Sequence, residues 1–388
     1  DKGHLVDLAH RRFEQRHHEI MSGDVHDRDG LLAVIFAARR AYRDWADDLA
    51  RAFSRACQAN GFLPDESLQQ RTIYDRVVTP LVSEGGKAAV FLVDAFRYEM
   101  AAELKRELEG PGVTVDLKVA LAELPTITSV GMNVLAAVNQ GPRLVPVISG
   151  GDINGFQTSE FQVRTRDHRA RAMGDRADRK APKQLDLETI SRLTTTELRA
   201  IVARAPALIV VHSRELDDGG ESGFGAVTFE RSLRQIRAAW NQLSQAGVKQ
   251  FVFLADHGFL LQDGTAREEQ YGLRTDPSRR HVIEEHSRSE PGMISVPMSS
   301  LRYQLPQERY LLMREDTAVW KTTVRGASFV HGGNSLQERV VPVLVVRRKQ
   351  SAGAADTEYE VRAEALEDRH GRRRVRLQLR LAPNAVGT

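Results

Sequence analysis

Cysteine is nearly absent from this sequence of 388 residues, which contains only Cys57. A single cysteine excludes a disulfide within the chain and excludes a metal cluster held by several thiolates. A chain that folds without disulfides fits a reducing compartment, so we expect a cytoplasmic protein.

Long apolar runs and a strong excess of either charge are missing as well. No stretch approaches the roughly 18 apolar residues that a membrane span requires, so we expect no membrane partner. The first ten residues, DKGHLVDLAH, lack a signal-peptide pattern and an initiating methionine, which suggests a piece of a longer protein. The formal net charge of +3 is only weak support for an anionic partner.

What the chain does contain is enough apolar sequence for a sizeable core. Apolar residues make up 41% of it, and its length suggests two or three domains. Residues 1–85 have a helical pattern, because apolar side chains between Leu31 and Phe53 recur at spacings of three and four. We expect a packing helix there that has no chemistry and ends near Gly61, with a shorter helix over residues 5–20.

A different pattern begins after Gly85 and Gly86, where short apolar runs alternate with helical segments. Continuous apolar runs are typical of buried parallel strands, whose faces are covered by the helices between them. We therefore predict an α/β fold with a mostly parallel sheet flanked by helices. The predicted strands are residues 88–93, 113–119, 207–212, 251–256 and 340–346, and the predicted helices include 97–108 and 229–243.

The C-terminal residues alternate between apolar and polar side chains, which is typical of antiparallel strands. Residues 359–365 and 375–381 show this alternation, and the polar segment 367–372 lies between them. We predict a hairpin within a small β-domain. The predicted domains are 1–85 (helical), 86–348 (the α/β core) and 349–388 (β-rich).

Polar side chains with metal-binding chemistry follow the ends of the predicted strands. Ligands of open α/β sheets gather at the carboxyl edge, where those strand ends meet. A single aspartate there is more often a turn former or a helix cap, and a lone histidine is more often structural. Five positions on one edge are difficult to explain by packing alone. They are Asp94; Thr126, Thr128 and Ser129 of LPTITSVGM; an aspartate of HSRELDDGGE; Asp256 with His257; and His331, which directly precedes the last strand.

The order of these residues resembles the alkaline phosphatase superfamily. More narrowly, VDAFRYEM, LPTITSVGM, ADHGF and HGGNSLQERVVPVL together resemble the PglZ domain of the phage-defence systems called phage growth limitation and BREX. The resemblance covers residues 85 to 348. Each motif is moderately specific, and their order and spacing together are a strong signal.

The resemblance implies two divalent metals and a threonine nucleophile, Thr128. One metal would be held by Asp94, the hydroxyl of Thr128, Asp256 and His257, and the other by Asp217, a residue four positions later and His331. A metal would favour the alkoxide of Thr128, which otherwise stays protonated at neutral pH. Mixed aspartate and histidine ligands suit Zn²⁺ best, and carboxylate-rich sites also admit Mn²⁺ or Mg²⁺.

The second metal site departs from the superfamily, which usually has histidine four residues after the aspartate. Here Asp217 is followed at that spacing by Glu221, and Asp218 is followed by Ser222. Glu221 is the leading candidate ligand, His212 is the alternative, and neither is the third option. With a carboxylate in this place the site would prefer Mn²⁺ or Mg²⁺, bind zinc weakly or stay vacant.

Two basic segments have both a functional and a structural interpretation. Residues 164–180 lie between the threonine motif and Asp217, so this segment is a candidate cap that binds phosphate. Its candidate substrate-binding residues are Arg164, Arg166, Arg169 and Arg171. The segment HGRRRVR at 370–376 is either a nucleic-acid patch or the charged face of an outer strand. For both segments a solvated charged surface is the more common outcome.

The leading functional prediction is a metal-dependent phosphohydrolase that acts on phosphodiesters, including nucleic acid, with Thr128 as the nucleophile. By resemblance it would serve in phage defence as a subunit of a BREX-type assembly that also contains a DNA methyltransferase. The alternative is a scaffolding subunit with a structural or vestigial metal site, which Glu221 favours. A phosphomonoesterase or phosphomutase of the same superfamily is a third interpretation.

Overall fold

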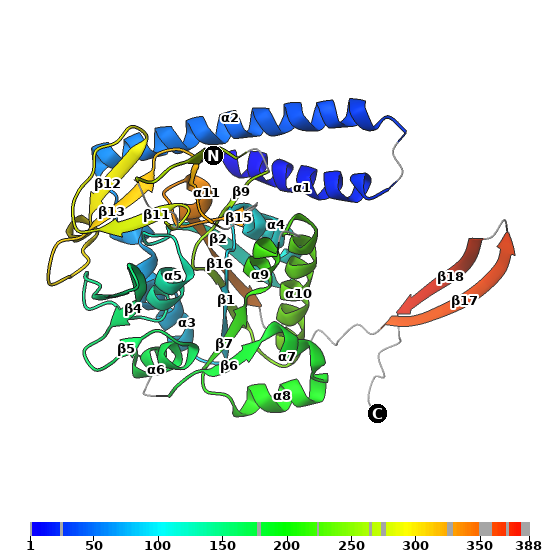
Figure 1. The fold of residues 1–388 in the computed structure, drawn as a ribbon. Coiled ribbons are helices and arrows are strands. Elements are labelled where there is room, and N and C mark those ends of the chain that lie inside the picture. Colours follow the sequence, from blue (N-terminus) through cyan, green and yellow to red (C-terminus); the bar gives the residue numbers. More distant parts are fainter. Residues whose placement is uncertain are drawn as a thin grey trace. The chain divides into compact units, whose positions relative to one another are not determined.

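The structure is a computed structural model that describes residues 2–23, 26–176, 180–222, 225–263, 266–272, 277–323, 329–348, 359–369 and 372–381. The chain forms two compact units, Asp1–Arg347 and Arg348–Thr388. The first contains the N-terminal helices, the central sheet and the predicted site residues, and the second contains the C-terminal hairpin (Figure 1). The three-part division at residues 85 and 348 stays a prediction.

Six strands form the central sheet of the first unit. Their order across the sheet is β2 (Val113–Leu121), β16 (Val340–Arg348), β8 (Gln250–Ala255), β1 (Ala88–Val93), β7 (Leu208–Ser213) and β6 (Lys183–Asp186). β1 is buried along its whole length and runs parallel to its neighbours β7 and β8. A strand covered on both faces must be apolar throughout, which explains the continuous apolar run in the sequence. The predicted α/β fold is confirmed.

One strand of this sheet runs in the opposite direction to its neighbour. β16 pairs antiparallel with β8, whereas β6, β7, β1 and β8 are parallel, so the sheet is mixed. The physical reason lies in the preceding chain. At His331 the chain is already at the carboxyl edge of the parallel strands, and only α11 (Leu336–Arg339) separates that region from β16. β16 can therefore only run back across the sheet.

Helices cover both sides of the sheet, as predicted (Figure 1). α4 (Tyr98–Leu108), α7 (Leu187–Arg192), α8 (Thr195–Arg204) and α10 (Gly225–Gln245) lie on one side, and η3 (Tyr74–Val78), α3 (Thr79–Ser83) and α6 (Arg166–Arg176) lie on the other. On α10, Phe229, Leu233 and Ile236 are buried in the main core. Their spacings of four and three place them on the helix face that meets the sheet.

A second hydrophobic core is built on two small antiparallel sheets, ordered β3-β4-β5 and β11-β13-β12. The strands are β3 (Pro146–Ser149), β4 (Asp152–Gln157), β5 (Gln162–Val163), β11 (His281–Glu284), β12 (Met293–Pro297) and β13 (Tyr310–Arg314), and η4 (Met298–Leu301) follows β12. α5 (Thr128–Val134) packs against both cores: Val130 and Val134 belong to the second, and Met132 belongs to the main one. Burial on two sides fixes this short helix, whose first residue is Thr128.

Two short strand pairs connect segments that are distant in the sequence. β10 (Glu268–Glu269) pairs with β14 (Val319–Trp320), and β9 (Leu260–Leu261) pairs antiparallel with β15 (Phe329–Val330). In the second pair Val330 lies opposite Leu260, four residues after Asp256. This pairing brings His331 to the end of β8.

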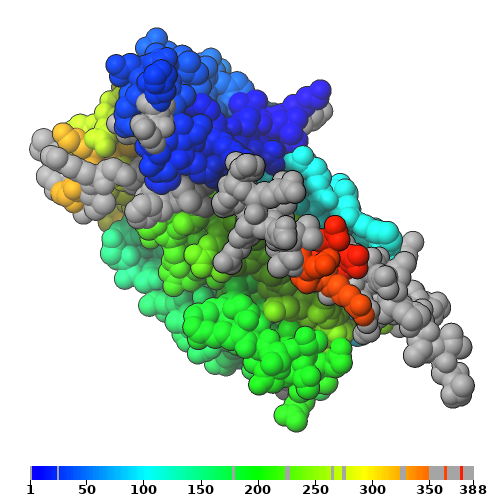
Figure 2. Space-filling model, turned by 90° about the vertical axis from the view of Figure 1, so that its right-hand side faces the viewer, coloured from blue at the N-terminus to red at the C-terminus, as the bar shows by residue number. Residues whose placement is uncertain are grey.

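The N-terminal helices α1 (Gly3–Met21) and α2 (Arg28–Asn60) lie along one end of the first unit, above the green helices in Figures 1 and 2. Both predicted helices are confirmed, and both are longer than the apolar pattern indicated. α2 begins early because the Asp27 side chain caps it by accepting from the backbone of Gly30. No described helix, these two included, is long and apolar enough to cross a membrane.

Buried ion pairs join α1 to the core. The Arg11 Nε atom lies 3.0 Å from Glu99 Oε1 on α4, and both side chains are buried. Asp7 accepts a hydrogen bond from the hydroxyl of Tyr42 at 2.8 Å, and the same oxygen lies 2.8 Å from Arg97 Nη2. Charges removed from water in this way require their partners, so α1 is a structural part of the sheet-containing unit.

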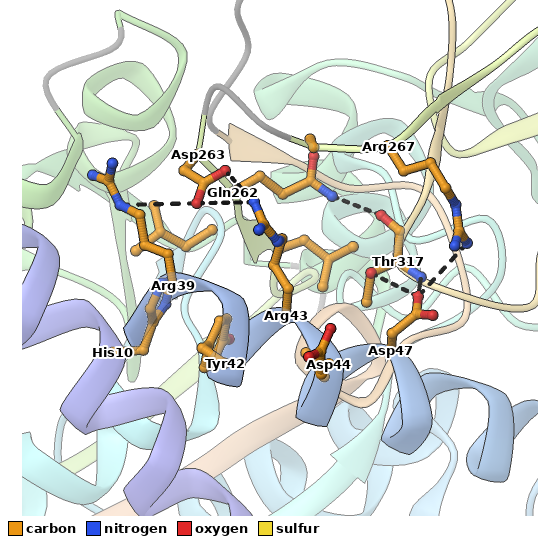
Figure 3. A pocket seen from close by; sticks show the side chains of 14 residues that line it. His10, Arg39, Tyr42, Arg43, Asp44, Asp47, Gln262, Asp263, Arg267 and Thr317 are labelled. Carbon is orange, nitrogen blue, oxygen red and sulfur yellow. Dashed lines mark hydrogen bonds and ion pairs between the residues drawn. The ribbon is translucent and has the colours of Figure 1, made fainter. Parts of the chain in front are cut away.

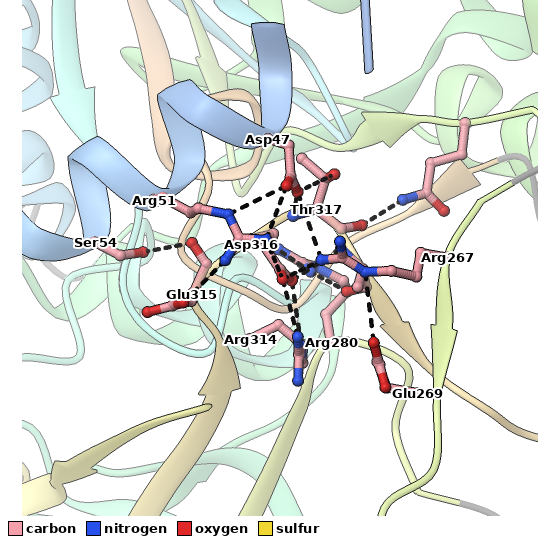
Figure 4. Close-up of polar contacts among 12 residues, drawn as sticks. Asp47, Arg51, Ser54, Arg267, Glu269, Arg280, Arg314, Glu315, Asp316 and Thr317 are labelled. Atoms are coloured by element: carbon pink, nitrogen blue, oxygen red, sulfur yellow. Dashed lines mark hydrogen bonds and ion pairs between the residues drawn. The ribbon is translucent and has the colours of Figure 1, made fainter. Parts of the chain in front are cut away.

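α2 meets the core across a polar seam. A pocket of about 140 Å³ lies between α2 and residues 260–263 and 266–267, and arginine and carboxylate side chains line it (Figure 3). Arg43 of α2 lies 3.0 Å from Asp263 in this pocket. Next to it, Asp316 accepts hydrogen bonds from Arg51 of α2 and from Arg314 (Figure 4). Hydrogen-bonded charges therefore hold α2 against the core here.

The second unit is an antiparallel hairpin of β17 (Tyr359–Arg369) and β18 (Arg372–Leu381). Its register places Val361 opposite Leu379, and Glu364 opposite Arg376, so apolar and polar pairs alternate along the ladder. The predicted hairpin is confirmed, with strands that extend further toward the turn than the sequence pattern indicated. The basic segment 370–376 begins outside the described residues.

Candidate metal centre

The first cluster of predicted ligands lies at the ends of β1 and β8. Asp94 follows β1, and Asp256 and His257 follow β8, its parallel neighbour, so the three side chains emerge side by side. Their potential ligand atoms all lie within 4.8 Å of one another. His257 Nε2 is 3.3 Å from Asp256 Oδ2 and 3.7 Å from Asp94 Oδ1. The sequence placed these residues at one edge, and the structure brings them together.

Thr128 is the hydroxyl of LPTITSVGM that faces this cluster. Its Oγ1 atom lies 3.4 Å from Asp94 Oδ1 and 3.2 Å from His257 Nε2. The two neighbouring hydroxyls have structural partners instead. Thr126 donates to the carbonyl oxygen of Gly333, and Ser129 donates to that of Ile153.

A glycine allows α5 to approach the cluster. A Cβ atom at Gly131 would lie 2.6 Å from the Cβ of Asp256 and closer still to its carbonyl oxygen. The helix backbone therefore touches the strand end directly. On another side, Gln70 donates from Nε2 to the carbonyl oxygens of Ala255 and Asp256 at 2.8 and 2.7 Å. Sequence analysis did not identify Gln70, because no local pattern connects it with a strand end about 185 residues away.

The second cluster consists of Asp217, Glu221 and His331, whose potential ligand atoms also lie within 4.8 Å of one another. Asp217 and Glu221 are one turn apart on α9 (Glu215–Glu221), which follows β7. His331 Nε2 is 3.9 Å from Asp217 Oδ1. The alternative residue, His212, lies outside this cluster, and its Nε2 contacts the side-chain oxygen of Gln184 at 3.1 Å.

Both histidines present Nε2 to the clusters in the form that binds a cation. The Nδ1 atom of His257 lies 3.0 Å from the carbonyl oxygen of Gly258, and that of His331 lies 3.1 Å from the carbonyl oxygen of Thr126. A carbonyl oxygen only accepts, so Nδ1 carries the proton and Nε2 keeps its lone pair. Burial lowers the pKa of His257 to about 4 and that of His331 to about 3, so both rings are neutral. The rings stack with centroids 4.1 Å apart.

The positive charge near the two clusters does not balance their carboxylates: burial and the neighbouring carboxylates outweigh Arg214, which lowers the pKa of Asp94 and Asp217. Burial, reinforced by the charges of Asp256 and Asp217, raises the pKa of Asp94 well above its usual value. Burial also raises the pKa of Asp256. At the second cluster, burial and the nearby charge of Glu221 raise the pKa of Asp217 to about 7. In each case the burial of an anion away from water is the largest cause of the shift.

One carboxylate oxygen in each cluster is buried and has no hydrogen-bond partner among the described residues. These atoms are Asp256 Oδ2 and Asp217 Oδ1. An unpartnered buried carboxylate oxygen is costly, and a bound cation would satisfy it. Neutral imidazoles and carboxylates at these distances fit two divalent cations, one in each cluster. The roles of the individual residues as ligands stay predictions.

The raised pKa of Asp217 gives a testable pH dependence for the metal-free protein. Its carboxyl group binds its proton more tightly in the folded state than in the unfolded state, where the pKa is about 3.9. It therefore contributes stability below pH 4 that is lost as pH rises through about 7. In chelator, Asp217→Asn should gain stability relative to the wild type between pH 5 and pH 8, measured by urea unfolding. If the difference in unfolding free energy between the two proteins stays constant over this range, the pKa of Asp217 is not raised.

A pocket of about 310 Å³ opens beside the first cluster, and basic side chains line one part of it. Its lining includes Asp94, Thr128, Met132, Arg166, Arg169, His212, Ser213, Arg214 and Asp217. Of the four predicted arginines, Arg166 and Arg169 line this pocket. Arg164 does not, and Arg171 lies 4.0 Å above the ring of Phe161. Arg214, at the end of β7, was not predicted.

Arg169 reaches toward the threonine helix. Its Nη1 atom donates to the side-chain oxygen of Asn133 on α5 at 3.2 Å, and its Nε is buried with no hydrogen-bond partner among the described residues. Burial, followed by the charge of Arg166, lowers the pKa of Arg169 to about 10. The guanidinium group is therefore charged at neutral pH, lines the same pocket as Thr128 and has unused hydrogen-bonding capacity.

Comparison with known proteins identifies relatives over most of the chain. Residues 73–346 match the family described as "BREX system PglZ alkaline phosphatase-like domain". The chain is 26% identical over 370 residues to "Alkaline phosphatase-like protein PglZ" of Bacillus cereus (strain H3081.97), covering 90% of this chain and 41% of that protein. It is 27% identical over 321 residues to "Alkaline phosphatase-like protein BrxZ" of Escherichia coli O9:H4 (strain HS), covering 74% and 33%. The chain thus spans less than half the length of these relatives.

Solved structures with similarity to this fold include two hydrolases. Phosphonoacetate hydrolase from Sinorhizobium meliloti 1021, in complex with phosphonoformate, is 11% identical with a TM-score of 0.45, covering 70% of this chain and 92% of that one. Human ectonucleotide pyrophosphatase / phosphodiesterase 5 is 10% identical with a TM-score of 0.43, covering 68% and 89%.

Proposed function

Because this chain belongs to the family of BREX system PglZ alkaline phosphatase-like domains, we propose that it is a metal-dependent phosphoric ester hydrolase. One observation carries this proposal: a single threonine hydroxyl, that of Thr128, lies between Asp94 and His257 in a cluster suited to a divalent cation. The second cluster lies beside it, because the rings of His257 and His331 stack. Asp94, Thr128, Asp256 and His257 would hold one cation, and Asp217, Glu221 and His331 would hold the other.

In the proposed reaction Thr128 Oγ1 loses its proton to solvent and attacks phosphorus, and the bond from phosphorus to the leaving oxygen breaks. The leaving oxygen takes up a proton from water, and a phosphothreonine forms that keeps the other ester group of a diester substrate. Water then cleaves the phosphothreonine and restores the hydroxyl. Bound divalent cations would favour the threonine alkoxide and neutralise the developing charge. Asp94 Oδ1 and His257 Nε2 orient the hydroxyl, since both lie within 3.5 Å of its oxygen.

The ligand types favour Zn²⁺ in the first cluster, where histidine and carboxylates mix. The second cluster offers the same mixture of two carboxylates and one histidine, and because carboxylates also suit hard cations, Mn²⁺ or Mg²⁺ can replace Zn²⁺ in either cluster. The substrates we propose are phosphodiesters, including nucleic acid. Arg166 and Arg169 would bind non-bridging phosphate oxygens, because they line the pocket that contains Thr128.

The biological role we propose is phage defence in the cytoplasm, as one subunit of a BREX-type assembly with a DNA methyltransferase and other defence subunits. The names of the curated relatives support the link to BREX. The chain covers less than half of each relative, so the role and partners of those proteins are carried over to this chain only as part of the proposal.

The decisive experiment combines metal analysis with two assays on the same preparation. Metal-stripped protein is reloaded with Zn²⁺, Mn²⁺ or Mg²⁺ and offered a chromogenic phosphodiester, a phosphomonoester and a single-stranded oligonucleotide. We expect two metals per chain and faster hydrolysis of the diester than of the monoester. Protein that binds metal but hydrolyses none of the three under any cation would favour the scaffolding alternative. A faster monoester reaction would favour a phosphomonoesterase.

Glu221 gives a second prediction, specific to the second cluster. Glu221→Ala removes a proposed ligand, so we expect weaker metal binding in that cluster and hydrolysis at least about tenfold slower. Glu221→His restores the usual histidine of the superfamily and should raise the zinc affinity of the cluster. Both effects are measured as metal stoichiometry and diesterase rate. Wild-type values for both quantities in Glu221→Ala would show that Glu221 is not a ligand.

A further inference from the structure

A buried ion pair lies against the loop that follows His331, and its side chains have no hydrogen bond to the proposed ligand atoms of the described residues. Arg280 and Glu338 are joined by two hydrogen bonds, from Nη2 to Oε2 at 2.9 Å and from Nε to Oε1 at 3.2 Å. Both side chains are fully buried. The proposed reaction uses neither residue, and two charges withdrawn completely from water must have a structural or positional role.

The carboxylate of this pair holds the loop that carries His331. Glu338 Oε1 accepts from the backbone N–H of Gly333 at 2.8 Å, and Oε2 accepts from the backbone N–H and the hydroxyl of Ser335 at 3.1 and 2.6 Å. With the two bonds from Arg280, one carboxylate gathers five hydrogen bonds. Three of these five come from residues two to four positions after His331.

Thr126 holds the same loop from the opposite side. Its hydroxyl donates to the carbonyl oxygen of Gly333 at 2.9 Å and accepts from the backbone N–H of Gly332 at 3.0 Å. Its carbonyl oxygen accepts from Nδ1 of His331 at 3.1 Å. The backbone that follows His331 and the ring itself are therefore fixed from two directions.

The loop is packed too closely for larger residues. A Cβ atom at Gly332, whose φ is +119°, would lie 2.6 Å from Nδ1 of His281, and one at Gly333 would lie 2.9 Å from Nη2 of Arg280. The Arg280 side chain thus packs directly against the backbone of this loop. A small displacement of that side chain would therefore move the loop, and with it the ring of His331.

Arg280 is itself fixed on its far side. Its Nη1 atom donates to the carbonyl oxygens of Asp316 and Ala318, and the Asp316 carboxylate is held by Arg314 and by Arg51 of α2 (Figure 4). Each of the three nitrogens of this guanidinium thus donates either to the Glu338 carboxylate or to the carbonyl oxygens of Asp316 and Ala318. Arg280 bonds to the segment 316–318, and Glu338 bonds to the loop that follows His331, so the pair connects the two.

We propose that Arg280 and Glu338 are positioning residues that set the ring of His331 for the second metal and so determine the affinity of the second cluster. This inference rests on the proposed function, because it assigns His331 to a metal. Groups that orient a ligand in this way typically change metal affinity by about 10–100-fold when they are replaced. The first cluster, at Asp94, Asp256 and His257, should be largely unaffected, because Glu338 meets it through the backbone: its carbonyl oxygen accepts from the N–H of Gly258 at 2.8 Å, and the side-chain variants keep that bond.

The test is calorimetric titration of metal-stripped protein with Mn²⁺ and with Zn²⁺, a readout that does not depend on turnover. In Glu338→Gln the amide still accepts from Gly333, but its NH₂ group faces the donors of Arg280 and Ser335. We expect the affinity of the second cluster to fall about 10–100-fold and that of the first to stay within about twofold of the wild type. Arg280→Lys, which keeps the charge but not the planar fork, should give a smaller loss at the same cluster.

Two further variants separate positioning from a simple loss of stability. Glu99→Gln disturbs another buried pair, with Arg11, that faces α1, so it should leave both metal affinities unchanged. The double variant Arg280→Met with Glu338→Leu removes both charges together and avoids an unpaired buried charge. It should fold and still bind the second metal weakly, because the backbone donors at Gly333 and Ser335 lose their acceptor.

The outcomes are distinct. Wild-type affinity of both clusters in Glu338→Gln, or in the folded double variant, would overturn the positioning role while leaving the proposed function standing. A wild-type protein that binds no divalent metal would instead overturn the proposed function. Equal weakening in Glu99→Gln would show that the effect reflects general destabilisation and would also count against the inference.

Discussion

Thr128→Ala should lower kcat for phosphodiester hydrolysis by at least about 10³-fold, since removing a nucleophile costs up to on the order of 10⁶-fold in other enzymes with covalent intermediates. The reason is geometric. The Thr128 hydroxyl lies within 3.5 Å of both Asp94 and His257, and the other hydroxyls of its motif bond to backbone carbonyls elsewhere. The variant should keep its fold, because a hydroxyl and a methyl group are lost from a half-buried position. Rates and thermal unfolding are measured on the same preparation.

The controls for this experiment come from the same motif. Thr128→Ser keeps a hydroxyl and should retain most of the activity. Ser129→Ala removes the hydrogen bond to Ile153, which costs about 1 kcal/mol of stability but no chemistry. If Ser129→Ala is inactive and Thr128→Ala is active, the assignment of the nucleophile is wrong.

Gly131→Ala should damage the site through packing alone. The added methyl group would overlap the backbone of Asp256, and neither partner can yield easily, because one is in a helix between two cores and the other ends a central strand. We expect a loss of about 1–3 kcal/mol in the free energy of unfolding, as for overpacked cores. Hydrolysis should fall with it, since Thr128 and Asp256 move apart.

Gly110→Ala is the matched control, because a Cβ atom there meets nothing within 4 Å and the residue does not have a positive φ. It should be close to neutral in both stability and rate. Stability is measured by urea unfolding and the rate by diester hydrolysis. Wild-type stability in Gly131→Ala would mean that α5 does not approach the strand end as closely as the structure has it.

The strand-end residues could be predicted from the sequence because their signal is local. An apolar run that stops at Asp94 or at Asp256 marks a buried strand and its edge without any knowledge of the rest of the chain. The direction of β16 could have been predicted in the same way. His331 precedes its strand, so it can reach the carboxyl edge only if that strand runs antiparallel to the others. The order of the residues therefore indicated an antiparallel β16.

The helical phase of the basic segment explains which arginines line the pocket. Arg166 and Arg169 are three residues apart and share one face of α6, whereas Arg171 lies well round the helix and meets Phe161. Their separation follows once the segment is known to be a helix. The charge pattern alone indicated a candidate phosphate-binding cap or a solvated surface, and it did not indicate which arginines share a face.

Contacts between segments that are distant in the chain could not be predicted from the sequence. Gln70 supports the end of β8 and Arg280 pairs with Glu338, and in each case the partner is set by the tertiary fold. One part of the second pair did have a local signature. Ser335 and Glu338 have the spacing of a capping box, and both hydrogen bonds of that box are present at the start of α11.

The docking of α1 has a practical consequence for anyone who wishes to express the hydrolase alone. The sequence changes near residue 85 from a helical pattern to short apolar runs, so an expression boundary chosen from the sequence would fall there. A polypeptide that starts at that boundary would lack Asp7 and Arg11, the ion-pair partners of Arg97 and Glu99, and Arg97 packs against Gly258, next to His257. Arg97, beside the end of β8, would then lose Asp7, and Glu99 on α4 would lose Arg11, although these two residues keep their own contact at 3.8 Å. Removing one partner of a buried ion pair typically costs about 3–5 kcal/mol. The smallest fragment worth producing therefore begins at the first helix.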